Sequence, residues 1–489
     1  VDGKVTVDSV IAASDWAWAK CDAKNPFPGT PDATQICLKN GFDPKLLYQL
    51  VFTAENPPVL GVGFAAFRDV ASFFRNEAKD DFGTANPLAG KIKHVISRGN
   101  SQSGNFLRGF IHLGFNQDEA GRQVHDGAWP IIAGRRIALN FRWAQPDGVL
   151  ELYQAGSEGP QWWVPWPDKV RGLPERGILD RCNTTKTCPK IIEHFGSAEV
   201  WALKLTPEWV GTDGKTDIPL PDNVRRYYIA SSNHGGYIVP TPNTMFNASL
   251  AGQTLPPPNC PGNNFGTAVL APNVMPHIQT VNALRQHFRN WVMQGVAPPP
   301  SVWPRLSKGE LVDSNKAAMG FPTIPGIPPS IPDNFIMPTF DYDWGPDFNA
   351  DDGSGVPTKL PPPIRQVINM KVPRVNADGN EVGGVPVVLH DAPLGTYLGW
   401  NITAGGARPF HAGQICNYVG GMVPFAKTKA ERVASGDSRL SLEERYKDHA
   451  GYVAAVRAAA ANAVAKGFLL QADADALIVQ AEASAVLRP

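Results

Sequence analysis

The 489-residue sequence lacks the features that mark several large protein classes. Its charge is balanced, with 45 Lys and Arg against 45 Asp and Glu, and no run of basic residues stands out. We therefore expect no surface for nucleic acid or anionic lipid. No apolar run reaches the roughly 18 residues that a membrane-spanning helix needs, so we also expect no membrane span. A small or neutral partner is favoured.

The sequence also lacks an initiating methionine and a recognisable leader, since it begins at Val1. The chain before Leu46 is short for the early strands of a large sheet, which suggests further sequence upstream. Cysteine is scarce: there are six, and none lies in a Cys-x-x-Cys pair, which argues against a zinc site. Cys182 and Cys188, in "CNTTKTC", are spaced for a small disulfide loop. The even count favours an oxidising compartment, although unpaired buried thiols fit nearly as well.

The hydrophobic pattern alternates between strand-like and helix-like segments. "LLYQLVFTAENP" predicts a strand, "GFAAFRDVASFFRN" an amphipathic helix, "KIKHVISR" a strand, and residues 104–113 another helix. This order is typical of a mostly parallel sheet with crossover helices. "HDGAWPIIAG", "KIIEHFGSAE" and "VRRYYIASSNHGG" predict three more strands, and "TVNALRQHFRNWVMQG" predicts the last helix of the sheet domain.

Two segments depart from this alternation. Residues from about 140 to 189 form an irregular, aromatic-rich insertion that contains Trp143, Tyr153, Trp162, Trp163 and Trp166. Beyond residue 297 the chain becomes Pro-rich, and it ends in predicted helices that open with a capping box, Ser441 and Glu444. We predict a core over residues 1–297 that contains the insertion. Residues 298–489 are predicted to be a wrapping segment and helical extension packed on that core.

The stretch "HVISRGNSQSGNFLRGF" predicts a strand, a tight turn and a helix, an arrangement that can hold a nucleophilic serine. A serine hydroxyl needs a base to take its proton and donors to stabilise the oxyanion. In such a turn, the residues two before and two after the nucleophile must be small. Ser101 is flanked by Gly99 and Ser103, whereas Ser103 would be flanked by Ser101 and the larger Asn105. We predict Ser101 as the nucleophile and the Gln102 amide as an oxyanion donor, although such a cluster can also simply cap a helix.

The acid and the histidine of such a site follow on later strands, in that order. Among ten histidines, His234 fits best, because it follows the last predicted strand and precedes two glycines. Glu199 lies just beyond a strand end and is predicted to orient His234. Asp126 lies at the start of its strand and is interpreted as a structural hydrogen-bonding residue. Glu193 lies within a strand and would point to one face of the sheet. Other acids stay open, namely Asp213, Asp217 and Asp222. The loop around Ser14, Asp15 and Trp16 is a possible second oxyanion donor.

Four stretches carry a resemblance to a known family: "NPPVLGVGFAAFRDVASFFR", "GNSQSGNFLRGFIHLGFNQDEAGRQVHDGAWPIIAG", "VPRVNADGNEVGGVPV" with "LGTYLGWNI", and "SLEERYKDHAGYVAAVRAAAA". From about Phe42 to the C-terminus the chain resembles a large bacterial family of α/β-hydrolase domain proteins. The resemblance implies an α/β-hydrolase fold and, by the turn pattern, Ser101 as nucleophile. Members look exported, which implies a periplasmic or secreted location. The chain departs from many hydrolases at Asn100, where they carry an aromatic residue.

These observations predict a serine hydrolase that cleaves a small-molecule carboxylic ester through Ser101, Glu199 and His234, with no metal and no organic cofactor. The insertion lies where such hydrolases carry a cap. Trp162, Trp163 and Trp166 are predicted to contact substrate, although packing of the insertion on the sheet fits about as well. Two alternatives remain: a peptidase or acyltransferase with the same triad, and an inert binding protein on the same scaffold.

Overall fold

The computed structural model describes most of the chain. The described residues are 9–43, 46, 48, 50–52, 55, 56, 61–134, 160–236, 244–253, 255–260, 266–333, 335, 336, 338–352, 354–359, 362–405, 412–416 and 418–488. Trp143 and Tyr153 of the aromatic insertion lie outside these residues. The strand expected over 46–57 lies partly outside them too, and its described residues carry no strand.

A four-stranded parallel sheet forms the centre of the fold, in the order β3-β4-β7-β8. Almost every residue of its last three strands is buried, as expected when helices cover both faces of a parallel sheet. Tyr227 of the last strand also makes an isolated parallel bridge to Val302. The bounds of the strands are β3 (Ile96–Asn100), β4 (Gly127–Ile131), β7 (Lys190–Gly196) and β8 (Val224–Ile229).

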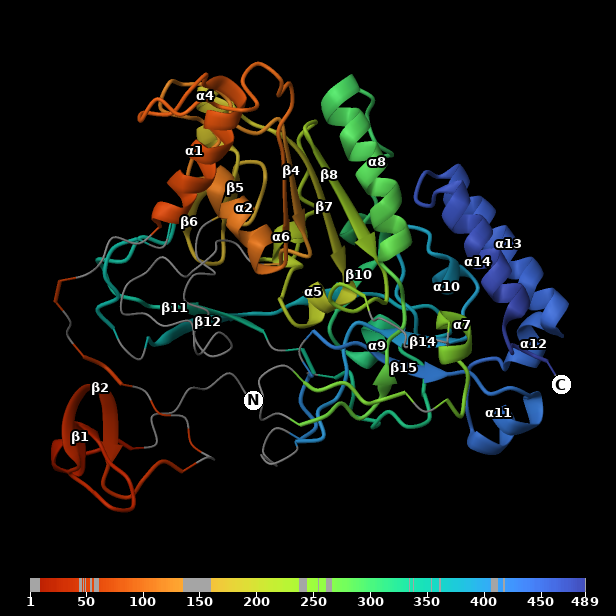
Figure 1. The fold of residues 1–489 in the computed structure, drawn as a ribbon. Coiled ribbons are helices and arrows are strands. Elements are labelled where there is room, and N and C mark those ends of the chain that lie inside the picture. The colour runs from red at the N-terminus through yellow and green to blue at the C-terminus, as the bar shows by residue number, and fades with distance from the viewer. Residues whose placement is uncertain are drawn as a thin grey trace.

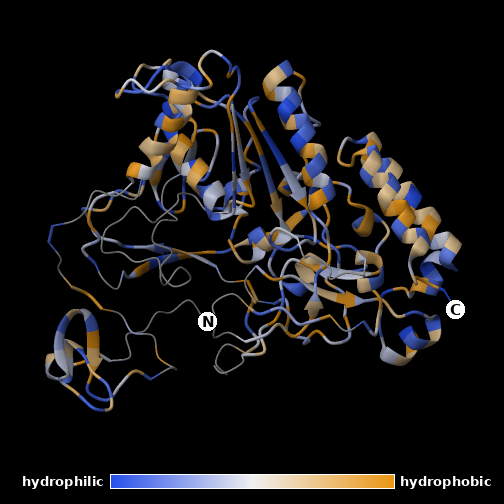
Figure 2. Cartoon of the chain, in the orientation of Figure 1, coloured by the Kyte–Doolittle hydropathy of each residue, from blue (hydrophilic) through white to orange (hydrophobic). Residues whose placement is uncertain are grey.

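Alternate residues of these strands point to opposite faces of the sheet. Helix α8 (Ile278–Gln294) covers one face, where the core contains Trp129, Ile192, Tyr227 and Phe288. Figure 2 shows hydrophobic and hydrophilic residues interleaved along α8, as in an amphipathic helix. Its contact with β4 is so close that a Cβ on Gly127 would lie 2.8 Å from the Phe288 ring.

The opposite face is covered by α2 (Gln102–His112), on which α1 (Val62–Asn76) packs. The rings of Phe64 in α1 and Phe106 in α2 stack with centroids 4.5 Å apart. Figure 1 shows α1 and α2 beside each other, with α8 on the other side of the strands. The described residues thus form the α/β architecture expected from the sequence.

Strand β3 and helix α2 begin or end differently from the sequence expectation. β3 begins at Ile96 and continues through Gly99 and Asn100, past the expected end at Arg98, and α2 begins at Gln102 instead of residue 104. The turn between them is therefore a single residue. The strand can run directly into the turn because Gly99 has no Cβ, which would lie 2.2 Å from the Ser103 carbonyl oxygen.

The remaining N-terminal and central elements lie outside this sheet. They are η1 (Ala13–Asp15), a hairpin of β1 (Trp16–Lys20) and β2 (Thr30–Leu38), a hairpin of β5 (Trp166–Asp168) and β6 (Leu173–Arg176), α4 (Asp180–Thr185), α5 (Ser197–Trp201), α6 (Pro207–Val210), α7 (Met245–Ala248) and β9 (Ala271–Pro272). Figure 1 shows α5 at the carboxyl ends of the sheet strands and the β1–β2 hairpin apart from the sheet.

The C-terminal half adds short strands and helices. They are η3 (Leu306–Lys308), β10 (Leu311–Asp313), α9 (Lys316–Met319), β11 (Thr339–Tyr342), β12 (Ile364–Ile368), β13 (Lys371–Pro373), α10 (Val388–Asp391), β14 (Gly395–Leu398), β15 (Gly421–Pro424), α11 (Lys429–Ser435), α12 (Leu442–Tyr446), α13 (His449–Ala465) and α14 (Gln471–Ala483). The capping box of Ser441 and Glu444 at α12 is confirmed. Tyr397, Tyr452 and Leu477 share a buried cluster with the sheet residues, so this half packs on the sheet core.

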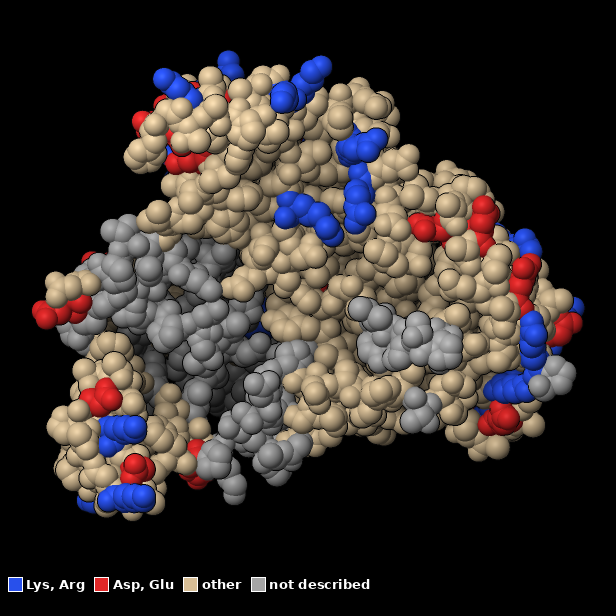
Figure 3. Space-filling model, in the orientation of Figure 1, with Lys and Arg blue, Asp and Glu red and all other residues tan. Residues whose placement is uncertain are grey.

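Charged side chains on the face shown in Figure 3 occur in small groups of both signs. No helix among the described residues has both the length and the apolar character needed to cross a membrane.

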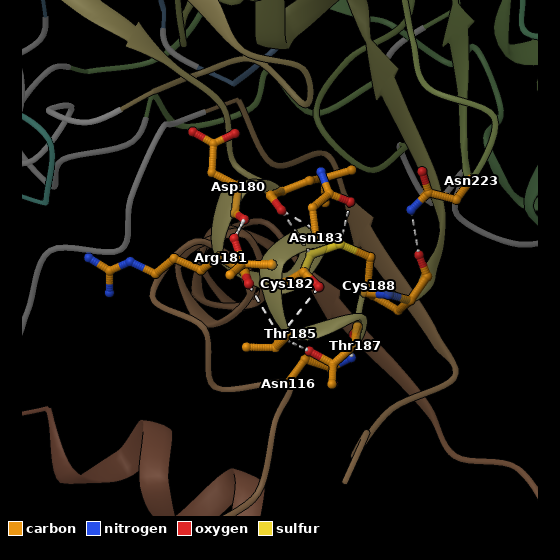
Figure 4. Close-up of a disulfide and its surroundings, with 12 residues drawn as sticks. Asn116, Asp180, Arg181, Cys182, Asn183, Thr185, Thr187, Cys188 and Asn223 are labelled. Carbon is orange, nitrogen blue, oxygen red and sulfur yellow. Dashed lines mark hydrogen bonds between the residues drawn. A yellow bond between two sulfur atoms is a disulfide. The ribbon is translucent and has the colours of Figure 1, made fainter. Parts of the chain in front are cut away.

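Three disulfides join the six cysteines: Cys21–Cys37, Cys182–Cys188 and Cys260–Cys416. Figure 4 shows the short loop closed by the second, in which the Thr187 amide donates to the Cys182 carbonyl oxygen over 2.9 Å. The amide group of Asn116 donates to the Thr187 carbonyl oxygen over 2.6 Å and so ties this loop to the segment after α2. The small loop expected from "CNTTKTC" is present.

The disulfides differ in the length of chain that they close, which gives a stability prediction. Cys182–Cys188 has a sequence separation of 6 and Cys260–Cys416 one of 156. Loop-closure entropy predicts that removing the short crosslink lowers the free energy of unfolding by about 2 kcal/mol and the long one by about 5 kcal/mol. Urea unfolding of the two double-alanine variants measures this, and equal losses would contradict it. Peptide mapping without reductant checks the pairing.

His125 lies just before β4, in a buried position between aromatic rings, although the sequence suggested that it belongs to the strand. Its ring stacks on Phe67 with centroids 5.0 Å apart, and its Nδ1 lies 3.1 Å from the side-chain oxygen of Asn116. Burial lowers the pKa of His125 from 6.5 to about 4. The folded chain therefore keeps this ring neutral at a pH where the unfolded chain protonates it.

This difference predicts a loss of stability in acid. Because the unfolded chain binds the proton more tightly, the contribution of His125 is complete above pH 6.5 and declines as the pH falls toward 4. Its titration should lower the free energy of unfolding by about 3 kcal/mol between pH 7 and pH 4. The variant His125→Phe keeps an aromatic ring and should show a correspondingly flatter pH dependence in urea titrations. An unchanged slope would contradict the assignment.

Candidate active site

Ser101 occupies a sharp turn between β3 and α2. Its backbone has φ 52° and ψ −118°, a conformation that costs a non-glycine residue free energy. The Ser101 amide donates to the Ile131 carbonyl oxygen over 2.8 Å, which fixes the turn to the neighbouring strand β4. The serine is only partly buried, so the end of β3 presents a hydroxyl at the edge of the sheet.

Two glycines make this turn possible. A Cβ on Gly99 would lie 2.2 Å from the Ser103 carbonyl oxygen, and one on Gly104 would lie 2.8 Å from the Ala133 side chain. The tight positions are therefore Gly99 and Gly104. Ser103, whose small size was taken as a requirement of the turn, is exposed. The backbone of Ser103, and not its side chain, lies close to Gly99. The turn therefore does not require a small side chain at residue 103.

The three residues expected to act together lie within hydrogen-bonding distance of one another. His234 Nε2 lies 2.8 Å from Ser101 Oγ, and His234 Nδ1 bonds to Glu199 Oε1. The His234 side chain is 16% exposed and that of Glu199 is fully buried. A substrate can thus reach one end of this chain of bonds, while the other end is shielded from water.

Glu199 is fixed by the helix that follows β7. It is the third residue of α5, and its second oxygen, Oε2, accepts the Gly196 amide at the end of β7. Both carboxylate oxygens therefore have partners. The turn also packs closely on the histidine loop, since a Cβ on Gly196 would lie 2.6 Å from the Asn233 carbonyl oxygen.

His234 lies on the loop that leaves β8. Its amide donates to the Tyr418 carbonyl oxygen over 3.2 Å, and the two rings have centroids 4.9 Å apart. Gly235 and Gly236 follow with φ of 86° and 88°, which matches the expectation that glycines let the loop turn here. The Gly236 amide donates to Asn233 Oδ1 over 2.8 Å. Contacts from both halves of the chain thus hold the loop.

His277, which precedes α8, lies beside this site although the sequence gave no reason to choose it. It is 4% exposed, and its Cε1 would be 3.0 Å from a Cβ on Gly196. Burial, followed by the nearby His234, lowers the pKa of His277 to about 4. The ring is therefore neutral near pH 7 and adds no positive charge beside His234. Its position depends on tertiary packing, so no local motif marks it.

The alternative acids lie elsewhere. Asp126 accepts the Val95 amide over 2.8 Å and pairs with Arg75 at 3.0 Å, which agrees with its interpretation as a structural residue. Asp217 accepts the amides of Leu306 and Ser307. Asp213 accepts the Lys215 amide, and Asp222 borders the turn that leads into β8. No described contact joins any of the four to His234.

Glu193 belongs to a buried ring of charges beneath α2. Arg108 of α2 contacts Glu193 at 3.3 Å and Glu208 at 2.9 Å, and Arg226 of β8 contacts each carboxylate at 2.7 Å. All four side chains are at most 3% exposed. Alternating charges compensate one another where water cannot. The ring ties the helix after Ser101 to β7, β8 and α6.

Two of the three tryptophans predicted to contact substrate are buried in packing. Trp162 is 2% exposed and donates from Nε1 to the Pro207 carbonyl oxygen over 3.0 Å. Trp163 is 1% exposed and lies beneath Arg108, whose guanidinium carbon is 5.1 Å from the ring centroid. Both rings are therefore packed largely against protein, although Trp162 also lines a pocket with Asp168 and Arg171. Their contact with substrate stays a prediction. Trp166 begins β5 and is partly buried.

Of the two donors expected for the oxyanion, the structure supports a position for only one. Gln102 is the first residue of α2, where a helix amide has no partner within the helix. Ser14, Asp15 and Trp16 lie in η1 and β1, and Figure 1 shows the β1–β2 hairpin apart from helix α2. No described contact joins these residues to Ser101, so the second donor suggested at that loop stays a prediction. Within the described ranges, no three His, Cys, Asp or Glu side chains lie together as a metal site would require.

Comparison with known proteins identifies the family to which this sequence belongs. Residues 3–479 match the family described as alpha/beta hydrolase domain. No curated protein and no solved structure matches the chain. The match covers nearly the whole sequence, and it agrees with the parallel sheet and its covering helices. The chain belongs to the alpha/beta hydrolase domain family, as its resemblance and its fold class predicted.

Proposed function

We propose that this hydrolase cleaves a carboxylic ester of a small molecule through an acyl-enzyme on Ser101. The observation that supports this most directly is the position of the His234 ring, which bonds to Ser101 Oγ through one nitrogen and to Glu199 through the other. A histidine held in this way can take the serine proton and keep the correct tautomer.

In the proposed reaction, Ser101 Oγ attacks the ester carbonyl as its proton passes to His234 Nε2. The Gln102 amide donates to the oxyanion of the tetrahedral intermediate. Collapse of the intermediate breaks the ester bond, and His234 returns the proton to the departing alcohol. Water then attacks the acyl group with His234 again as base, which releases the acid and restores the serine.

Glu199 stabilises the imidazolium that forms in each half-reaction. Its carboxylate is buried and held by the Gly196 amide, so it cannot turn away from His234 Nδ1. The neutral ring of His277 favours the same step, because a second positive charge there would oppose protonation of His234. The three disulfides support a periplasmic or secreted location, where such bonds persist.

Substitution of the two serines in the turn tests the nucleophile. Ser101→Ala should lower kcat for p-nitrophenyl acetate by about 10⁶-fold, because no other hydroxyl bonds to His234 in the described structure. Ser103→Ala is the matched control and should retain kcat, since that side chain is exposed. Mass spectrometry after a fluorophosphonate probe should locate the label on Ser101. Absence of labelling in the wild type would instead favour an inert scaffold.

Substitution of the acid tests its role separately. Glu199→Gln has nearly the same shape but presents a neutral amide to His234 Nδ1, so it neither fixes the reactive tautomer nor stabilises the imidazolium. We expect kcat to fall by about 10³- to 10⁴-fold while the melting temperature changes little. Asp126→Asn is the control, because that carboxylate bonds to Val95 and Arg75 instead. Full activity in Glu199→Gln would remove Glu199 from the mechanism.

A further inference from the structure

A buried carboxylate from the C-terminal half lies between the two loops that carry Glu199 and His234. Glu381, in the stretch "DGNEVGG", is 4% exposed. It sits on a tight hairpin, in which Val375 bridges to Glu381 and the Val382 amide donates to the Arg374 carbonyl oxygen over 3.0 Å. These backbone contacts hold the chain at Glu381 independently of its side chain.

One oxygen of this carboxylate contacts the helix that carries the acid. Glu381 Oε1 accepts the Ser197 hydroxyl over 2.6 Å and the indole N–H of Trp201 over 3.1 Å. These residues are the first and last of α5, and Glu199 lies between them. These two bonds thus hold both ends of the helix that presents Glu199 to His234.

The other oxygen contacts the strand and turn that lead to the histidine. Glu381 Oε2 accepts the Tyr228 hydroxyl over 2.7 Å and the Ser231 amide over 2.8 Å. Burial and the negative charge of Glu381 raise the pKa of Tyr228 well above its ordinary value, so this hydroxyl stays a donor. One side chain therefore bridges β7–α5 and β8 through four hydrogen bonds.

Ser231 is held in a strained conformation by the same residue. Its φ of 56° lies in the left-handed region, which is unfavourable for a non-glycine residue. The Glu381 amide donates to Ser231 Oγ over 2.8 Å, in addition to the bond from the Ser231 amide to the carboxylate. Both bonds act on the residue where the chain turns from β8 toward His234.

Glycines allow the C-terminal half to approach this closely. A Cβ on Gly384 would lie 2.7 Å from the Ala230 side chain, and one on Gly399 would lie 1.9 Å from Ser197 Oγ. The Val385 amide also donates to the Tyr228 carbonyl oxygen over 2.8 Å, which continues the contact along β8. The close approach is thus built into the backbone that follows Glu381.

We propose that Glu381 is a positioning residue of the active site, whose carboxylate fixes the acid turn and the histidine loop relative to each other. This inference rests on the proposed hydrolase function, because it concerns the alignment of the same three residues. Glu381 itself bonds to neither His234 nor Ser101 in the described structure. It acts through Ser197 and Ser231, at the points where the two loops leave the strands.

The test is Glu381→Gln, which keeps the shape of the side chain but replaces one carboxylate oxygen with an NH2 group. The two N–H donors of that group then face protein groups that are themselves donors. The loops should shift slightly, so kcat for p-nitrophenyl acetate should fall by about 10²-fold. KM should stay within about twofold, because only the alignment of Glu199, His234 and Ser101 changes. The rate of fluorophosphonate labelling at Ser101 should fall in parallel. Glu381→Asp retains the charge and should give an intermediate kcat.

Asp437→Asn is the matched control. Asp437 is also a buried carboxylate of the C-terminal half, but it bonds to Arg439, with Oδ1 2.9 Å from Nε and Oδ2 2.6 Å from Nη2. This variant should lose stability without losing kcat. A purely structural role for Glu381 would make the two variants behave alike.

The outcomes separate this inference from the proposed function. A wild-type chain that neither hydrolyses esters nor reacts with the probe would refute the proposed function. If the wild type is active and folded Glu381→Gln keeps its kcat, only the positioning role is overturned. Should Glu381→Gln fail to fold, Tyr228→Phe removes a single donor and leaves the carboxylate in place. It should lower kcat about threefold to tenfold at unchanged KM, and unchanged kcat would again overturn the positioning role.

Discussion

The register of the parallel sheet is the constraint on which the site depends. Asn100 pairs with Ile131, Ile131 with His194, and Gly196 with Ile229. These pairs align the carboxyl ends of β3, β7 and β8, so the loops that follow begin at the same edge. Ser101, Glu199 and His234 come from segments far apart in sequence and meet there only because the strands end together. A shift of one residue in any pair would turn alternate side chains to the wrong face.

Local features of the sequence were sufficient to predict the four strands of the sheet and the three residues that meet at its edge. They also predicted a strand over 46–57, whose described residues carry none. Apolar runs marked the strands, the glycines around Ser101 marked the turn, and chain order selected Glu199 and His234. His277 and Glu381 carry no such mark, because their proximity to the site arises from packing between distant segments. The tryptophans show a different limit. Large aromatic residues occur both in packing and in binding sites, and their burial, which tells the two roles apart, comes only from the structure.

Buried charge is used on both sides of the site. The ring of Arg108, Glu193, Arg226 and Glu208 anchors the helix after the serine, while Glu381 lies against the loops of the acid and the histidine. Each buried charge would be costly alone, and each is compensated by opposite charge or by several donors. Such groups tolerate few alternative arrangements, which suits a site in which small displacements matter.

The bond from the His234 amide to the Tyr418 carbonyl oxygen has a consequence for biosynthesis. During translation, Ser101, Glu199 and His234 leave the ribosome long before Tyr418 is added. A nascent chain can hold all three and still lack the contact that supports the histidine loop. The Cys260–Cys416 crosslink, which ends two residues before Tyr418, can likewise close only at that late stage. The histidine loop therefore lacks this support until the chain has been synthesised beyond Tyr418.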